Sequence, residues 1–188
     1  VLDVETRKVL GYVGNSPSDE THANYVDIIT KKRSTGSTLK PFLFASLLDE
    51  GQLLPHSLVE DVPTVINGYN PQNFDLKHVG AVPASKALSR SLNVPAVRLL
   101  REYGLQKFYN KLNKMKMESL DKPSSYYGLS LILGGAESSL WEVTSTYASM
   151  ASSLNYFLTH SSTYRNKEFT EATYLQNETK DFGREQFD

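Results

Sequence analysis

The sequence lacks cysteine, long apolar runs and an excess of charge of either sign. Without cysteine there is no disulfide, no thiol catalysis and no cysteine metal site. No run approaches the roughly 18 apolar residues that a membrane span needs, and no signal peptide is recognisable. Twenty basic side chains stand against twenty-one acidic ones, so the formal charge is −1. Because phosphate binding usually shows as a basic excess, nucleic acid is not the expected partner.

The 188 residues have a globular composition, with 39% hydrophobic and 22% charged side chains, and suffice for one domain or most of a larger one. Because the chain begins at Val1 without an initiator methionine, we take it for a piece of a longer protein. Runs of β-branched residues at 1–4 and 9–13 predict a hairpin. Apolar spacing predicts helices over 39–48, 84–92, 95–104, 105–115 and 140–154. Over 52–80 we expect irregular structure with short extended pieces, such as 64–66. For the polar and aromatic tail, 155–188, we expect a loose hairpin followed by disorder.

The segment Ser37-Thr38-Leu39-Lys40 is the first candidate for chemistry. Pro41 would break a helix interior, so the helix must begin only about one turn earlier, which places Ser37 at or beside its N-terminus. A lysine three positions after a serine lies on the same helix face and can reach its hydroxyl. If its pKa is lowered, that lysine can remove the proton that makes serine a poor nucleophile. Unpaired N–H groups at a helix start favour the oxyanion that then develops.

The second candidate segment, Ser91-Leu92-Asn93, falls at the junction of two predicted helices. Its serine could relay a proton, and its asparagine amide could hold a substrate carbonyl. Neither pattern is specific alone, because 119–122 repeats the first and 153–155 repeats the second. Solvated side chains or a helix cap explain such matches equally well. The scattered histidines lack the spacing of a metal site.

Longer segments carry a family resemblance. The stretch from Arg33 to Phe42 resembles the nucleophile segment of class A penicillin-binding proteins, and that from Ala87 to Val97 resembles the surroundings of their second motif. The interval of about 50 residues between the two suits that family, whose motif set begins with Ser-x-x-Lys. Matches at 49–51, 61–63, 69–75 and 129–135 narrow the resemblance to one branch of the family. It spans roughly residues 1–153, in order and without large gaps.

The resemblance implies the serine transpeptidase and β-lactamase-like α/β (α+β) fold, an antiparallel sheet packed against a helical lobe. We therefore expect 1–188 to be a partial transpeptidase domain with the first β-hairpin and the helical lobe, and the later sheet strands to be missing. The family's third motif, Lys-Thr-Gly or a close relative, does not occur in the sequence. Its strand ordinarily supplies an oxyanion donor worth about a hundredfold or more in rate. We expect the isolated chain to be weakly active or inactive.

The resemblance also implies a function and a role for each site residue. Ser37 would be the acylated nucleophile, Lys40 its base and Ser91 the proton relay of a peptidoglycan D,D-transpeptidase. Asn93, Tyr69 and Asn73 would bind substrate. The partners implied are D-Ala-D-Ala stem peptides and β-lactams, with no metal, no cofactor and no nucleic acid. The parent protein would be membrane-anchored at the periplasmic, extracytoplasmic face of the bacterial inner membrane.

Two other functions share the first two motifs. One is a β-lactam-binding sensor that does not turn over, and the other is a catalytically silent structural module of a cell-wall complex. The residues that separate these classes lie outside the two motifs, so both alternatives stay open at this point.

Overall fold

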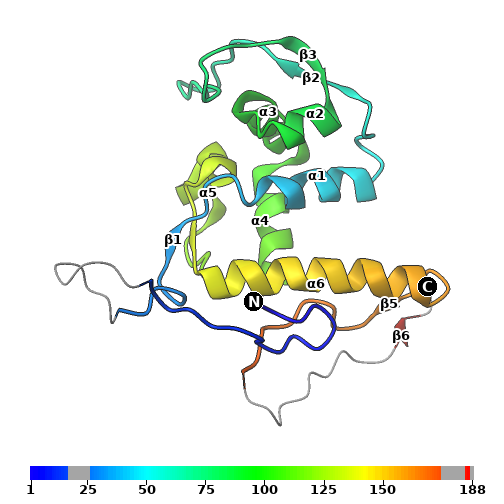
Figure 1. The fold of residues 1–188 in the computed structure, drawn as a ribbon. Coiled ribbons are helices and arrows are strands. Elements are labelled where there is room, and N and C mark those ends of the chain that lie inside the picture. The colour runs from blue at the N-terminus through cyan, green and yellow to red at the C-terminus, as the bar shows by residue number, and fades with distance from the viewer. Residues whose placement is uncertain (17–25, 175–184, 187–188) are drawn as a thin grey trace. The chain divides into compact units, whose positions relative to one another are not determined.

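The computed structural model describes residues 1–16, 26–174 and 185–186. The chain divides into two compact units. The first unit comprises Val1–Arg33, Leu112–Asp121 and Ser138–Asp188, and the second comprises Ser34–Lys111 and Lys122–Glu137. The regular secondary structure of the described residues consists of helices and short two-stranded sheets (Figure 1). This content agrees with the predicted α+β class.

Most elements follow one another along the chain with short connections, and a longer loop joins the second and third strands. In order they are β1 (Arg33–Ser34), α1 (Lys40–Asp49), β2 (Leu58–Asp61), β3 (Gly80–Pro83), α2 (Ala84–Ser89), α3 (Asn93–Tyr103), α4 (Leu105–Lys114), α5 (Ser124–Tyr127), the 3₁₀ helix η1 (Gly128–Leu133), β4 (Glu137–Ser138), α6 (Leu140–Thr159), β5 (Tyr164–Arg165) and β6 (Glu185–Gln186). Strands β1 and β4 pair, as do β5 and β6.

Helix α1 is the buried centre of the second unit. Pro41 occupies its first turn, where a missing N–H costs no hydrogen bond. The side chains of Phe42 and Leu43 are fully buried, and Leu47 is 3% exposed. Burying an apolar side chain of this size stabilises a fold by about 1.5–3 kcal/mol. Because apolar residues lie on most sides of α1, it packs against both α2 and α3.

Strands β2 and β3 form an antiparallel pair in the second unit, with Leu58 opposite Pro83 and Asp61 opposite Gly80. The chain then passes directly from β3 into α2, whose first residue, Ala84, is 1% exposed. Helix α3 follows after a sharp turn at 90–92 and is anchored by Val94 and Leu100, both fully buried. Helices α1 and α2 contact each other and both contact α3, whose first residue belongs to the second sequence motif (Figure 1).

The first unit is arranged on α6. The Ser139 hydroxyl caps this helix by accepting from the Glu142 N–H at 3.1 Å. Its buried face presents small hydroxyl residues, and the Ser145 hydroxyl accepts from the Ala172 N–H at 3.1 Å. The backbone of Thr173 in turn bonds to Arg7 and Val9 of the N-terminal segment. An irregular segment therefore links α6 to the start of the chain.

Several predicted elements are confirmed with shifted bounds. The predicted N-terminal hairpin reduces to a single antiparallel bridge between Leu2 and Val9. Helix α3 begins at Asn93 rather than at Pro95, and α6 ends at Thr159 rather than at residue 154. The four residues of β2 agree with the short extended pieces expected within 52–80, but the stretch 64–66 forms no strand. No element was predicted where the structure has α5 and η1.

No helix in the described ranges has both the length and the apolar character that crossing a bilayer requires.

Candidate active site

The Ser37 segment forms a chain of turns that leads into α1. The Thr38 N–H donates to the Thr35 carbonyl at 3.1 Å, and the Lys40 N–H donates to the Ser37 carbonyl at 3.1 Å. Gly36 allows the first of these turns because its φ is +52°. Ser37 is exposed and precedes the first helical residue by one tight turn. The predicted position beside the helix N-terminus is confirmed.

Lys40 is buried directly after this turn, with only 1% of its surface exposed. Its Nζ donates to the Ser91 carbonyl at 2.8 Å, to the Ser91 Oγ at 3.2 Å and to the Asn93 Oδ1 at 2.7 Å. Burial disfavours the charged ammonium and lowers the pKa of Lys40 from 10.5 to about 8. A substantial fraction of the amine is therefore neutral near physiological pH, as a general base requires.

Within the described residues, no hydrogen bond joins the Ser37 hydroxyl to Lys40. The three acceptors of the Lys40 amine lie instead in the second sequence motif. Catalytic hydrogen bonds are commonly longer before substrate binds and tighten afterwards. The structure thus assembles Lys40, Ser91 and Asn93 in direct contact and places Ser37 one turn away along the chain.

Ser91 owes its position to the way α2 ends. The Ser91 N–H donates to the Leu88 carbonyl at 2.8 Å and the Leu92 N–H donates to the Ala87 carbonyl at 2.9 Å, the pattern of a Schellman cap. Ser91 occupies the left-handed position of this cap, at φ +53°, where glycine is usual. The conformation directs both the carbonyl and the hydroxyl of Ser91 to the amine of Lys40.

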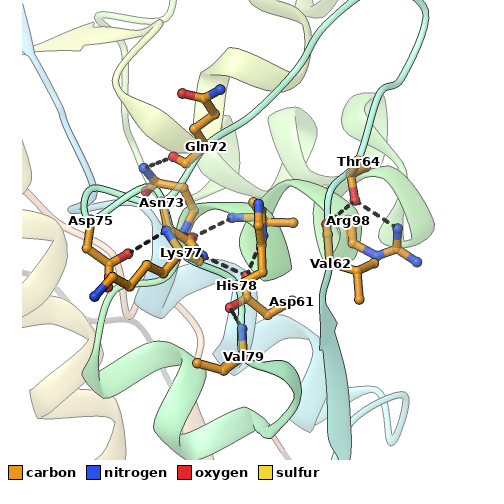
Figure 2. Close-up of polar contacts among 12 residues, drawn as sticks. Asp61, Val62, Thr64, Gln72, Asn73, Asp75, Lys77, His78, Val79 and Arg98 are labelled. Atoms are coloured by element: carbon orange, nitrogen blue, oxygen red, sulfur yellow. Dashed lines mark hydrogen bonds and ion pairs between the residues drawn. The ribbon is translucent and has the colours of Figure 1, made fainter.

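Asn93 is the first residue of α3 and is held at both its main chain and its side chain. Its Nδ2 donates to the Gln72 carbonyl at 2.8 Å, which leaves Oδ1 to accept from Lys40. Its backbone N–H donates to the Asn73 Oδ1 at 2.8 Å. Figure 2 shows the loop residues around this contact, with Asn73 beside Asp61 and Lys77. The loop between β2 and β3 therefore holds the Asn93 amide in its orientation through these hydrogen bonds.

The two loop residues predicted to bind substrate have different surroundings. Asn73 is 3% exposed, and its side chain makes four hydrogen bonds to neighbouring protein groups. Tyr69 is half-buried, and burial raises the pKa of its hydroxyl. Its backbone exchanges hydrogen bonds with Ile66 across the Asn67-Gly68 turn. For both residues the contact with substrate stays a prediction.

Gly134 contacts the turn at 34–38, which carries Ser37 and is called the nucleophile turn below. The sequence did not indicate this contact. The Gly134 carbonyl accepts from the Ser34 Oγ at 2.8 Å, while the Ala136 carbonyl accepts from the Thr35 N–H at 3.0 Å. A Cβ on Gly134 would lie 2.8 Å from the Gly36 nitrogen and 2.9 Å from its Cα. Gly134 therefore lies directly against the turn that carries Ser37.

Gly134→Ala is expected to displace the nucleophile turn. Gly134 and Gly51 both have positive φ, +100° and +67°, but a Cβ on Gly51 meets nothing within 4 Å. Gly51→Ala is therefore the matched control, and costs only the left-handed backbone strain of about 1–2 kcal/mol. We expect Gly134→Ala to lower the free energy of unfolding, measured in urea, by more than Gly51→Ala does, and to slow the acylation of Ser37. Equal effects of the two substitutions on both measurements would contradict this role for Gly134.

An exposed serine, a buried lysine of lowered pKa and a second serine beside that lysine are the groups that Ser-Lys acyl transfer uses. Such a set of residues is typical of serine acyltransferases and hydrolases. A family model described as the penicillin binding protein transpeptidase domain matches residues 1–163. The chain belongs to this family of penicillin-binding protein transpeptidase domains, which confirms the resemblance seen in the sequence.

Curated relatives place the chain more narrowly. Penicillin-binding protein 1C of Escherichia coli is 40% identical over 152 residues, which cover 80% of this chain and 20% of that protein. It belongs to the branch that the shorter sequence matches indicated. Penicillin-binding protein 1F of Bacillus subtilis is 37% identical over 112 residues, 58% of this chain and 15% of that protein. The chain thus spans about a fifth or less of the length of these relatives.

Solved structures share the fold. The penicillin-binding protein PonA1 from Mycobacterium tuberculosis superimposes with a TM-score of 0.69 at 23% identity, over 81% of this chain and 41% of that one. The transpeptidase domain of Burkholderia pseudomallei penicillin-binding protein 3 gives a TM-score of 0.66 at 20% identity, over 81% of this chain and 49% of that one. The predicted serine transpeptidase fold is confirmed.

Proposed function

We propose that this chain carries the nucleophile and the proton-transfer residues of a peptidoglycan D,D-transpeptidase. The contact of the Lys40 amine with Ser91 and Asn93, directly after the exposed Ser37, is the observation that carries the proposal. Membership of the transpeptidase family supports it. On this basis 1–188 is part of a transpeptidase domain whose complete gene product acts on the extracytoplasmic side of the bacterial inner membrane.

The first half of the reaction is acylation. The neutral amine of Lys40 takes the proton of the Ser37 hydroxyl as its Oγ attacks the carbonyl carbon of the penultimate D-Ala of a stem peptide. The bond from that carbon to the nitrogen of the terminal D-Ala then breaks. Ser91, within 3.2 Å of the amine, passes the proton to the departing nitrogen. The products of this step are an ester on Ser37 and free D-Ala.

The second half transfers the acyl group to an acceptor. An amine from a neighbouring stem peptide attacks the ester carbon, loses a proton through Ser91 and Lys40, and releases Ser37 with its hydroxyl restored. Asn93 presents its amide to the donor peptide. Tyr69, in the loop between β2 and β3, is the second residue expected to contact this peptide. A β-lactam enters at the first step, since its strained amide is attacked by the same oxygen. The solved complex of PonA1 with penicillin V supports this ligand class for the family.

Labelling of the complete gene product tests the proposal. After incubation with a fluorescent penicillin and digestion, mass spectrometry should find the adduct on the peptide that contains Ser37. A D-Ala-D-Ala peptide with a free amine acceptor should yield D-Ala and a new amide. An adduct on another serine contradicts the assignment of the nucleophile. Acylation by penicillin without release of D-Ala indicates a sensor, and no acylation under conditions that label the Escherichia coli relative indicates a silent module.

The 188-residue chain alone should be labelled slowly. The sequence has no Lys-Thr-Gly segment, and the strand bearing that motif supplies one oxyanion donor in the family. Removal of such a donor typically costs about 100- to 1,000-fold in rate. We expect the labelling rate of the isolated chain, measured by gel fluorescence, to fall below that of the complete gene product by at least this factor. Equal rates would show that the third motif is dispensable here.

A further inference from the structure

We propose that Asn73, supported by Asp61, is a positioning residue that fixes the start of α3 and through it aims Asn93 at Lys40. This inference rests on the proposed function for the role of Lys40. It differs from the role predicted for Asn73 from the sequence, because the side chain acts here through Asn93 and not on the substrate.

The Asn73 amide uses its full hydrogen-bonding capacity. Its Nδ2 donates to the Asp61 Oδ1 at 2.7 Å and to the Lys77 carbonyl at 2.8 Å. Its Oδ1 accepts from the Asn93 N–H at 2.8 Å and from the Val94 N–H at 3.2 Å. A primary amide has two donors and an oxygen that accepts two bonds, so each is matched. Rotation of the amide by 180° would turn its donors toward two N–H groups, which leaves one stable orientation.

The contact with Asn93 and Val94 supplies a helix cap from outside the helix. The residue that precedes α3, Leu92, has no side chain that can accept a hydrogen bond, and none caps the helix locally. The first N–H groups of a helix have no partner within it and must find one elsewhere. The Asn73 oxygen satisfies two of them from a position 20 residues upstream of Asn93. The start of α3 is thereby fixed to the loop between β2 and β3.

Asn93 transmits this constraint to the acyl-transfer site. Its main chain is held by Asn73, and its Nδ2 is held by the carbonyl of Gln72, the preceding loop residue. With both ends held, its Oδ1 has one direction, and in that direction it accepts from the Lys40 Nζ at 2.7 Å. Loss of the Asn73 contact would free α3 to fray at the residue that holds the catalytic amine.

Asp61 anchors Asn73 to the sheet. It is the last residue of β2 and has no exposed surface. Its Oδ2 accepts from the Val79 N–H at 2.9 Å, and its Oδ1 accepts from Asn73. The His78 Nδ1 lies 3.6 Å from the same Oδ1. Burial of a carboxylate is costly unless hydrogen bonds compensate it, and these donors provide that compensation. Figure 2 shows Asp61 with Asn73, His78 and Val79 around it.

An exchange of the two side chains tests this arrangement. In Asn73→Asp a second carboxylate faces Asp61, and in Asp61→Asn an amide with mismatched donors faces Asn73. Each single variant is expected to slow penicillin acylation of the complete gene product by about 10- to 100-fold, as loss of an outer-shell partner does at other sites. The double variant restores a donor on residue 61 opposite an acceptor on residue 73, but it turns a carboxylate oxygen toward the Lys77 carbonyl. It should therefore recover only part of the lost rate and be acylated faster than either single variant, as coupled neighbours are in a double-mutant cycle.

Hydrogen exchange gives a readout that does not depend on activity. The backbone N–H groups of Asn93 and Val94 should be protected in the parent, exposed to exchange in each single variant and protected again in the double variant. Rapid exchange at both amides in the parent overturns the proposal even if a single variant fails to fold. A folded double variant without recovered rate or protection also overturns it, as does slowed acylation with unchanged protection.

Glu50→Gln is the matched control. Glu50 lies at the far end of α1 and accepts from the Tyr103 hydroxyl at 2.6 Å, with Lys107 and Lys111 beside it. Its substitution should lower the thermal midpoint and leave the acylation rate and the Asn93 exchange unchanged. A comparable rate loss in this control would mean that general destabilisation, and not positioning, explains the Asn73 result. If the parent is not acylated at all, the proposed function fails, while the exchange measurements still test the positioning.

Discussion

Ser37→Ala is expected to reduce acylation of the complete gene product by penicillin by on the order of a million-fold, the loss seen when a serine enzyme loses its nucleophile. In the proposed mechanism the Oγ of Ser37 forms the ester, and no neighbouring group is expected to replace it. Ser91 lies 3.2 Å from the same amine, but its left-handed backbone ties its hydroxyl to Lys40. Stability should change little, because Ser37 is exposed and lies before the helix.

The sequence itself supplies the control for this experiment. Ser119 begins a second Ser-x-x-Lys pattern, so Ser119→Ala removes a serine from the same sequence motif. We expect this variant to be labelled at the parental rate, as measured by gel fluorescence and by the mass of the intact protein. Undiminished labelling of Ser37→Ala would refute the assignment. Loss of labelling in Ser119→Ala alone would move the nucleophile to the second pattern.

Lys40→Arg is expected to slow acylation by about 100- to 10,000-fold, the usual contribution of a general base. Arginine keeps the positive charge but stays protonated at all relevant pH values, so it cannot accept the proton of Ser37. The parental rate should rise with pH through about 8, because burial lowers the pKa of Lys40 to about 8 and the neutral fraction of the amine grows through that value. The pH–rate profile of Lys40→Arg should lack this rise.

Lys122→Arg is the corresponding control, since Lys122 closes the second Ser-x-x-Lys pattern on an exposed position. It should retain both the rate and the pH profile of the parent.

The lowered pKa of Lys40 also predicts a change in stability that is independent of catalysis. Between about 8 and 10.5 the unfolded chain binds more protons than the folded one, so the free energy of unfolding should rise with pH in that window. Lys40→Met should remove that rise, and its persistence would exclude Lys40 as its source.

Local pattern was enough to predict where the two motifs lie. Pro41 located the start of α1, so the position of Ser37 beside that start followed from a steric rule. The junction of two helices near 91–93 followed from the apolar spacing that ends at 92 and from Pro95, a residue typical of a helix start, and the structure confirms the junction. Contact between the motifs could not be read from spacing. The contact depends on the packing of α1 against α2 and α3. This packing joins residues that lie about 50 positions apart along the chain, such as Lys40 and Ser91.

The start of α3 shows why a local rule failed. Proline favours the first helical position, and the sequence therefore predicted a start at Pro95. The helix begins at Asn93 because Asn73 accepts the first two N–H groups from a distant loop. The Asn67-Gly68 turn was the overlooked local signal in that loop, since Asn-Gly typically forms a tight hairpin turn. It would have indicated order in a segment predicted to be irregular.

The left-handed backbone of Ser91 sets stability against function at one position. Glycine adopts φ +53° without the penalty of a Cβ, so Ser91→Gly would relieve strain in the cap of α2. The same change would delete the hydroxyl proposed to relay protons beside Lys40. Selection for folding alone would therefore favour glycine at this position, and only selection for chemistry would retain serine. A laboratory screen that rewards heat resistance without assaying acylation should accumulate this substitution and lose the enzyme's proton relay unnoticed.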